Sequence, residues 1–228
     1  MNFKKLFSLF AITLSAFGLF GASKASAMRS DNKPNVKAVM LGNCGTGKTC
    51  LLNVLAGREF GEMYVPSFGG EMISLDYYNH RDSRSVTVWD TAGQEAFMGL
   101  TSNYVRDADI ILAVFSHNDK ISYDNLNTWV NFAKDVCSVE YSENNLPKLI
   151  IVGTKNDLEK SFDVDEKALK NMFADFDLLY ISTSAMNCDG VDCLKENLVQ
   201  LGSKINSAKK NMQKNIKLNA NPKKNNCC

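Results

Sequence analysis

Apolar residues in the middle of this chain follow two periods, one typical of strands and one typical of helices. Residues 109–116 (DIILAVFS) and 148–153 (KLIIVG) are continuous apolar runs, as in strands that are buried on both faces of a sheet. Two alternating segments flank the polar residues 79–82, so we predict that they form a hairpin. The predicted strands are residues 35–41, 71–78, 85–89, 109–116, 148–153 and 178–181.

Helical spacing of apolar residues separates several of these strands. It predicts helices at residues 48–56, 122–137 and 191–210. Strands that alternate with helices along a chain indicate an α/β fold. We therefore expect a mostly parallel six-stranded sheet, with one antiparallel strand and with helices on both faces.

The composition fits one such domain with appendages. The 228 residues include 45% apolar and 22% charged residues, which is typical of a soluble globular protein. Seven lysines in residues 204–228 and three in residues 1–27, without any acid in either segment, turn the total charge of +1 into −9 for residues 28–203. A negatively charged domain argues against nucleic-acid binding, whereas a basic tail suits an anionic membrane surface.

The seven cysteines are an odd number, and their spacing matches neither a zinc module nor a disulfide framework. We interpret them as reduced thiols of a cytosolic protein. The last two, Cys227 and Cys228, follow a Lys/Asn segment and form a predicted double-lipidation site. Stable membrane anchoring takes two attachments, or one attachment and basic charge. The alternative is a pair of incidental exposed thiols.

Residues 1–27 have the features of a secretory signal peptide. Two lysines precede the uncharged residues 6–21, and small residues follow at a suitable cleavage position. The alternative is a spurious upstream extension, with Met28 as the true start. Export and cytosolic lipidation cannot both act on one molecule. We divide the chain into residues 1–27, excluded from the fold, a short leader at 28–34, a folded domain at 35–206 and a flexible basic tail at 207–228.

Residues 42–49 (GNCGTGKT) fit the phosphate-binding pattern G-x-x-x-x-G-K-[ST], between a predicted strand and a predicted helix. Small residues let backbone N–H groups approach phosphate oxygens, and the helix directs its positive end at the same anion. Lys48 adds positive charge over the terminal phosphates, and the Thr49 hydroxyl is a ligand for Mg²⁺. The predicted nucleotide-binding residues of this loop are Asn43, Cys44, Gly45, Thr46, Gly47, Lys48, Thr49 and Cys50.

Residues 89–95 (WDTAGQE) extend the pattern, because they match the second switch of the Ras-superfamily small GTPases. Together with the loop, they make residues 35–206 resemble that superfamily, and most of all its Rab branch. The resemblance implies that Asp90 holds Mg²⁺ through water and that Gly93 offers its amide to the γ-phosphate. It also implies that Gln94 orients the attacking water, so that Gln94 and Lys48 are the catalytic residues.

Residues 64–67 (YVPS) match the first switch of that family. Ser67 would contact Mg²⁺ only when a third phosphate is present. Phe60 occupies the place where the family sets a ring against the guanine, with an ordinary core phenylalanine as the alternative.

Two further segments resemble the family's guanine-recognition motifs. In residues 154–157 (TKND), Asp157 would accept hydrogen bonds from guanine N1 and N2, which adenine cannot supply, and Lys155 would lay its stem along the base. Ser184 and Ala185 resemble the fifth motif, whose backbone amide faces the guanine O6.

Four site positions depart from the family pattern. Cys44 replaces a glycine or serine and would crowd the attacking water, and Ser67 replaces threonine, so that the closed switch loses a packing methyl group. Thr154 replaces asparagine and Met186 replaces lysine, each of which would weaken a base contact by about 0.5–1.5 kcal/mol. Residues 68–71 also differ from the usual Rab sequence, so effector identity does not transfer.

The resemblance implies a switch that hydrolyses GTP to GDP with Mg²⁺, on the cytosolic face of intracellular membranes, in vesicle trafficking. The implied partners are an exchange factor, a GTPase-activating protein, a GDP-dissociation inhibitor or escort, effectors, and a membrane reached through C-terminal prenyl groups. No arginine in cis is tied to the γ-phosphate, so intrinsic turnover is expected to be slow. The alternatives are a GTP-loaded scaffold with little hydrolysis, another P-loop enzyme such as a nucleoside monophosphate kinase, and an exported bacterial effector that mimics a host Rab.

Overall fold

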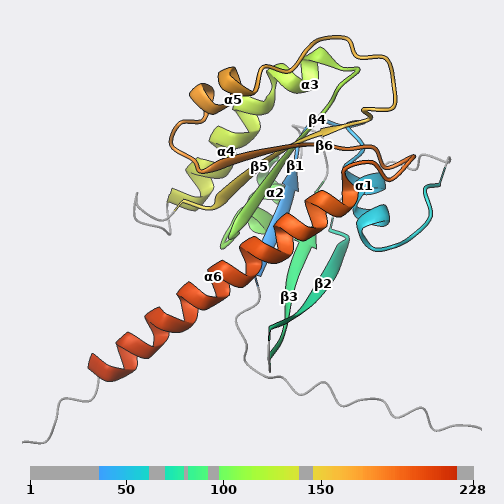
Figure 1. Ribbon diagram of the computed structural model, residues 1–228. Coiled ribbons are helices and arrows are strands. Elements are labelled where there is room, and N and C mark those ends of the chain that lie inside the picture. The colour runs from blue at the N-terminus through green and yellow to red at the C-terminus, as the bar shows by residue number, and fades with distance from the viewer. Residues whose placement is uncertain (1–35, 62–69, 80–81, 92–97, 139–145, 220–228) are drawn as a thin grey trace, which may run out of the picture. The chain divides into compact units, whose positions relative to one another are not determined.

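Six strands form one sheet in the order β2-β3-β1-β4-β5-β6 in the computed structural model (Figure 1), which describes residues 36–61, 70–79, 82–91, 98–138 and 146–219. Strands β2 and β3 pair antiparallel, and every other neighbouring pair is parallel. The predicted α/β sheet is therefore confirmed. The strands are β1 (Val36–Leu41), β2 (Met72–Asn79), β3 (Asp82–Trp89), β4 (Ile110–Ser116), β5 (Lys148–Thr154) and β6 (Leu178–Ser182).

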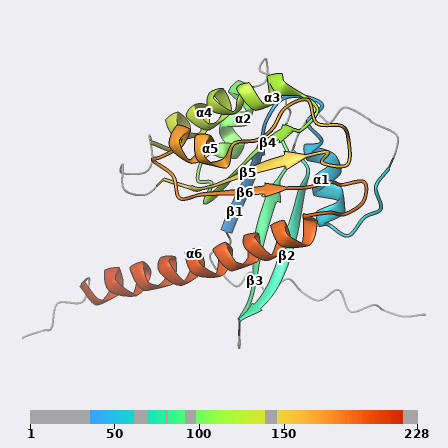
Figure 2. The same cartoon turned by 45° about the horizontal axis from the view of Figure 1, so that its top comes forward.

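Helices cover both faces of this sheet (Figures 1 and 2). One face packs against α1 and α6, and the other packs against α2, α3, α4 and α5. None of the described helices combines the length and the apolar composition that crossing a membrane requires. The helices are α1 (Lys48–Leu55), α2 (Met98–Val105), α3 (Lys120–Asp124), α4 (Leu126–Ser138), α5 (Glu166–Met172) and α6 (Val191–Asn219).

Strand β1 shows how the sequence fills both layers. Its side chains alternate between the faces of the sheet, as a period of two requires. Ala38 and Met40 belong to the core under α1 and α6, whereas Val39 and Leu41 belong to the core under the other four helices. All seven residues of β4 are buried, as its continuous apolar run predicted. The carboxyl ends of these central strands carry the loops described below.

The helices differ from the predictions at three places. The predicted helix at residues 122–137 is two helices, α3 and α4, which meet at Asn125, a residue whose side chain competes for backbone hydrogen bonds. Helices α2 and α5 were not predicted, because they are short and give little periodic signal. Helix α6 continues to Asn219, so the first part of the tail predicted as flexible from residue 207 is helical. That part contains good helix formers and neither Gly nor Pro.

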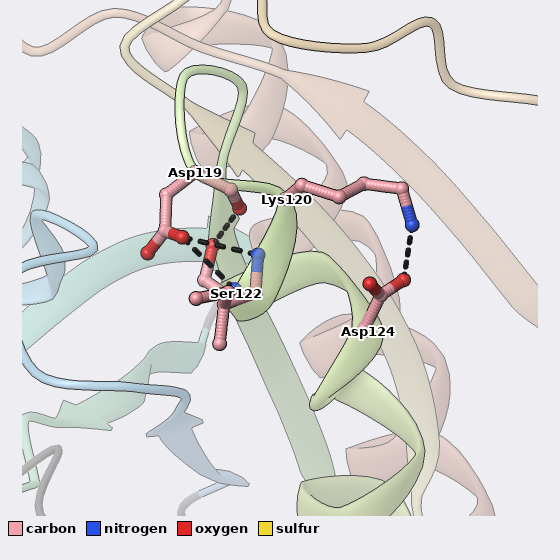
Figure 3. Close-up of polar contacts among 5 residues, drawn as sticks. Asp119, Lys120, Ser122 and Asp124 are labelled. Atoms are coloured by element: carbon pink, nitrogen blue, oxygen red, sulfur yellow. Dashed lines mark hydrogen bonds and ion pairs between the residues drawn. The ribbon is translucent and has the colours of Figure 1, made fainter.

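Local capping fixes the start of α3 next to β4 (Figure 3). The Asp119 carboxylate accepts hydrogen bonds from the backbone N–H groups of Ile121 (3.1 Å) and Ser122 (3.3 Å). The Ser122 hydroxyl donates back to the Asp119 carbonyl oxygen at 2.7 Å, and Lys120 forms an ion pair with Asp124 one turn later. These capping contacts fix the backbone conformation of the turn between β4 and α3.

Candidate nucleotide-binding site

The loop between β1 and α1 lies directly against β4. Gly42 has φ +149°, and a Cβ atom at this position would stand 2.1 Å from the backbone oxygen of Val114. Only glycine allows this close approach. Gly47 has φ +85° and is the N-cap of α1, so the chain turns there and the helix begins at Lys48. The predicted strand, glycine loop and helix are thus present in the geometry that a phosphate-binding loop needs.

Lys48 folds back over this loop. Its Nζ donates hydrogen bonds to the backbone oxygens of Gly42 and Asn43, both at 2.8 Å, and the side chain is buried. Burial lowers the pKa of Lys48 to about 8, although the Asp90 carboxylate nearby opposes the shift. Like the Asp90 carboxylate, a phosphate group at the loop would favour the charged form of the Lys48 ammonium. A bound phosphate would therefore raise the pKa of Lys48 again and keep its side chain charged.

The side chains of Thr49 and Asp90 meet across this loop. The Thr49 hydroxyl donates to Oδ2 of Asp90 at 2.7 Å, and Asp90 is fully buried at the end of β3. A hydroxyl and a carboxylate are hard oxygen ligands, and Mg²⁺ uses one or two such groups together with water and phosphate oxygens. The donor set therefore fits Mg²⁺.

A cavity of about 270 Å³ opens beside the loop, slightly smaller than the roughly 300–1,000 Å³ that is usual for ligand pockets. It brings together segments that lie far apart in the sequence. Leu158 is the one lining residue that the sequence analysis missed, and its position directly after the TKND segment was the available signal. The lining residues are Gly47, Cys50, Phe60, Thr154, Lys155, Asp157, Leu158, Ala185 and Met186.

Asp157 is held by the second recognition segment. The Ser184 hydroxyl donates to Oδ1 of Asp157 at 2.5 Å and accepts from the backbone N–H groups of Met186 (3.2 Å) and Asn187 (3.3 Å). The carboxylate is thus oriented at the rim of the cavity. The sequence suggested only a backbone role for this segment, so the orienting hydroxyl of Ser184 is an addition from the structure.

Thr154 does not direct its hydroxyl into the cavity. Its Oγ1 lies 2.5 Å from the backbone oxygen of Thr46 and 2.9 Å from that of Phe115, and the side chain is buried. A hydroxyl has one hydrogen, so it serves one of these acceptors at a time. Thr154 therefore fastens the end of β5 to the phosphate-binding loop.

A second fastening comes from helix α4. The Trp129 indole N–H donates to Oδ1 of Asn43 at 2.7 Å, and the Trp129 ring is buried. No motif or periodic pattern in the sequence indicated this pair. It fixes the side chain of Asn43 in the middle of the loop.

Three further residues that the sequence singled out, Cys44, Cys50 and Arg58, also lie in the described part of the chain. Cys44 is exposed on the loop. Burial raises the pKa of the Cys50 thiol, with the Lys155 ammonium acting against the shift. The exposed Arg58 guanidinium donates from one nitrogen to Oδ1 of Asn53 at 2.6 Å and to Oε1 of Glu71 at 2.5 Å.

Five predicted site residues lie outside the described residues, so their roles stay predictions. They are Ser67, Gly93, Gln94, Cys227 and Cys228. The described candidates from the loop, the TKND segment and residues 184–186 surround one site at the carboxyl ends of β1, β5 and β6, which is where open α/β sheets bind ligands.

Comparison with known proteins identifies similar chains. A family model described as the Ras family matches residues 37–204. Ras-related protein RABG3d of Arabidopsis thaliana is 33% identical over 172 residues, which cover 74% of this chain and 82% of that protein. Ras-related protein RIC1 of Oryza sativa subsp. japonica is 31% identical, and Ras-related protein RABD2b of Arabidopsis thaliana is 30% identical, each over 156 residues that cover 68% of this chain and 74% of the relative.

Proposed function

The chain belongs to the Ras family and is a small GTPase, and from this premise we propose that it is a Rab-like switch in membrane trafficking. In this proposal the protein binds guanine nucleotides, hydrolyses GTP to GDP, and presents different surfaces to its partners in the two states. The observation that carries the proposal is the Asp157 carboxylate, oriented by Ser184 at a cavity that adjoins the phosphate-binding loop.

Each described part of the site has a role in this proposal. The backbone of residues 42–47 and the Lys48 ammonium hold the phosphates. Thr49, and Asp90 through water, would hold Mg²⁺, which neutralises charge on the phosphate oxygens when it is bound. Asp157 selects guanine, because its two acceptor oxygens match two donors of that base. Gln94 orients the attacking water, as the resemblance implies.

The test is a measurement of nucleotide content and turnover on the purified full-length chain. We expect bound GDP or GTP on release by heat, and competition by GDP but not by ADP. We expect Gln94→Leu to keep wild-type GDP affinity and to lose nearly all phosphate release in a single-turnover assay. Unchanged release in Gln94→Leu would contradict that role, and equal competition by ADP would overturn guanine selection.

A scaffold that stays loaded with GTP is the second candidate. The exposed Cys44 favours it, because a side chain at this point of the loop stands where the attacking water is expected. The turnover measurement separates the two functions. A rate that a GTPase-activating protein cannot raise would favour the scaffold.

The proposed anchor is a pair of prenyl groups on Cys227 and Cys228, aided by the basic tail. It places the protein on the cytosolic face of intracellular membranes, with an exchange factor, an activating protein, an escort or GDP-dissociation inhibitor, and effectors as partners. Mass spectrometry of both termini of the native protein tests this. Lipid on either cysteine supports it, whereas processing after residue 27 with unmodified cysteines favours an exported effector.

A further inference from the structure

His117 lies directly after β4 and joins both ends of the loop that carries Asp157. Its backbone N–H donates to the Thr154 carbonyl oxygen at 3.0 Å. Its own carbonyl oxygen accepts from the backbone N–H of Ser161 at 3.0 Å and from the Ser161 hydroxyl at 3.3 Å. The main chain of His117 therefore closes the segment between residues 154 and 161.

The imidazole ring contacts strand β6, which leads into the second recognition segment. Its Nε2 lies 3.0 Å from the Ser182 hydroxyl and 3.2 Å from the Tyr180 hydroxyl, both on β6. Ser182 stands two residues before Ser184, which holds Asp157. The ring also lies against Gly153, where a Cβ atom would come within 2.6 Å of Nε2. With 2% of its surface exposed, His117 fills the space beneath both segments.

We propose that His117 is a positioning residue for base recognition, and that protonation of its ring loosens the two segments and speeds the release of guanine nucleotide. This inference rests on the proposed nucleotide-binding function. His117 lies outside the phosphate-binding loop and outside both guanine-recognition segments, so its contacts add a position to the site that these motifs do not include.

The surroundings of the ring oppose a positive charge. Nδ1 is buried without a hydrogen-bond partner among the described residues, so a protonated ring would hold an unsatisfied N–H there. The ionisable groups that face the ring are the neutral Tyr180 hydroxyl from β6 and the Lys160 ammonium from the loop after β5. From α3, Lys120 lies over the rings of Tyr123 and of Phe162, which pack against Phe115 beside His117. Burial, and then Lys160, lower the pKa of His117.

The burial of His117 determines the direction in which pH changes the opening of the two segments, and it limits the size of that change. Burial in the closed site favours the neutral ring, whereas in a locally opened site the ring regains an ordinary pKa of about 6.5. Acid therefore stabilises the opened site, and the closed site loses stability as the pH falls below 6.5. Between pH 7.5 and pH 5.5 the opened population rises by at most about tenfold through this one group.

The experiment measures the release of fluorescent GDP from the full chain at pH 7.5 and pH 5.5, with constant Mg²⁺ and excess unlabelled GDP. His117→Gln sets an amide near the position of Nε2 but does not titrate. We expect its release rate at pH 7.5 to stay within about twofold of wild type, and we expect it to lose most of the up to tenfold acid response. His80→Gln, which changes the other histidine of the chain, is the matched control and should keep the wild-type response.

His117→Phe keeps an aromatic ring but loses both nitrogens, so it should release GDP faster than wild type at both pH values. Thermal denaturation at both pH values separates local opening from global unfolding. An acid response in His117→Gln equal to that of wild type would overturn this inference, because other groups such as the nucleotide phosphates would then explain it. A wild-type chain that retains no GDP at pH 7.5 would instead overturn the proposed function, and this inference with it.

Discussion

Thr154→Val is the substitution that most directly tests how the base-binding and phosphate-binding halves of the site are connected. Valine has nearly the shape of threonine but lacks the hydroxyl. In the wild-type protein this buried hydroxyl lies between the backbone oxygens of Thr46, in the phosphate-binding loop, and Phe115, at the end of β4. The substitution therefore removes a connection without leaving a large cavity.

The expected loss of stability follows from the burial of these groups. Leaving a buried acceptor without its donor costs about 1–3 kcal/mol of the free energy of unfolding. For a domain of this size, that corresponds to a melting temperature lower by about 2–12 °C. The bond is present in the free protein as well, so the affinity for GDP falls only through the lost ordering of the loop. That ordering is worth about 0.5–1.5 kcal/mol, or roughly a two- to tenfold weaker Kd.

The assays are thermal denaturation followed by circular dichroism and a fluorescence titration with GDP. Thr154→Ser keeps the hydroxyl and should retain most of the affinity. Tyr77→Phe removes another buried hydroxyl, one that accepts from Asn206 at 2.7 Å between the edge strand β2 and helix α6, so it should lower the melting temperature but leave the Kd unchanged. If Thr154→Val matches wild type in both measurements, the connection has no energetic role and the reasoning is refuted.

Two further predictions concern the phosphate-binding loop. Trp129→Phe loses the indole donor to Asn43, worth about 1 kcal/mol, so GDP should dissociate about two- to fivefold faster in a stopped-flow displacement experiment; an unchanged rate would show that α4 does not hold the loop. The Lys48 pKa of about 8 in the free protein must rise when a phosphate binds, so this group supports binding fully well below pH 8 and loses that support as the pH rises through 8. The Kd for GDP should weaken about fourfold between pH 7 and pH 8.5, and Lys48→Met, measured by the same titration, should show a weak Kd without that slope.

The sequence predicted the parts of the fold that depend on local pattern. Strands β4 and β5 and the glycine loop before α1 are in the predicted places. Burial on both faces of the sheet requires continuous apolar residues, and the backbone at position 42 requires glycine, so both features can be recognised from residue types. The break between α3 and α4 could not be predicted in this way, because asparagine, the residue type at position 125, also occurs within helices.

The site was predictable only as far as single residues have characteristic roles. Lys48 and Asp157 were assigned from the motifs that contain them. In the structure Lys48 donates to the loop backbone and Asp157 lines the cavity beside the loop, while their roles stay predictions. The contact between Trp129 and Asn43 spans 86 positions in the chain, and nothing in either residue's neighbours indicates the other. His117 was missed for the same reason, because its partners Thr154 and Ser182 come from two later strands. Side-chain networks of this kind depend on tertiary packing, which a periodic pattern does not encode.

Helix α6 is longer than the sheet on which it packs. Its 29 residues span about 44 Å at 1.5 Å per residue, whereas the longest strands, of eight residues, span about 26 Å. About three turns therefore extend beyond the length of a strand. Lys209, in the first of them, still pairs with Asp109 at 2.5 Å, whereas the turns after it depend more on their own backbone hydrogen bonds. Short helices without tertiary support fray readily in water. Amide hydrogens in the last turns should consequently exchange with deuterium within seconds, while those near Leu198, in the buried core, should exchange only when the whole domain opens.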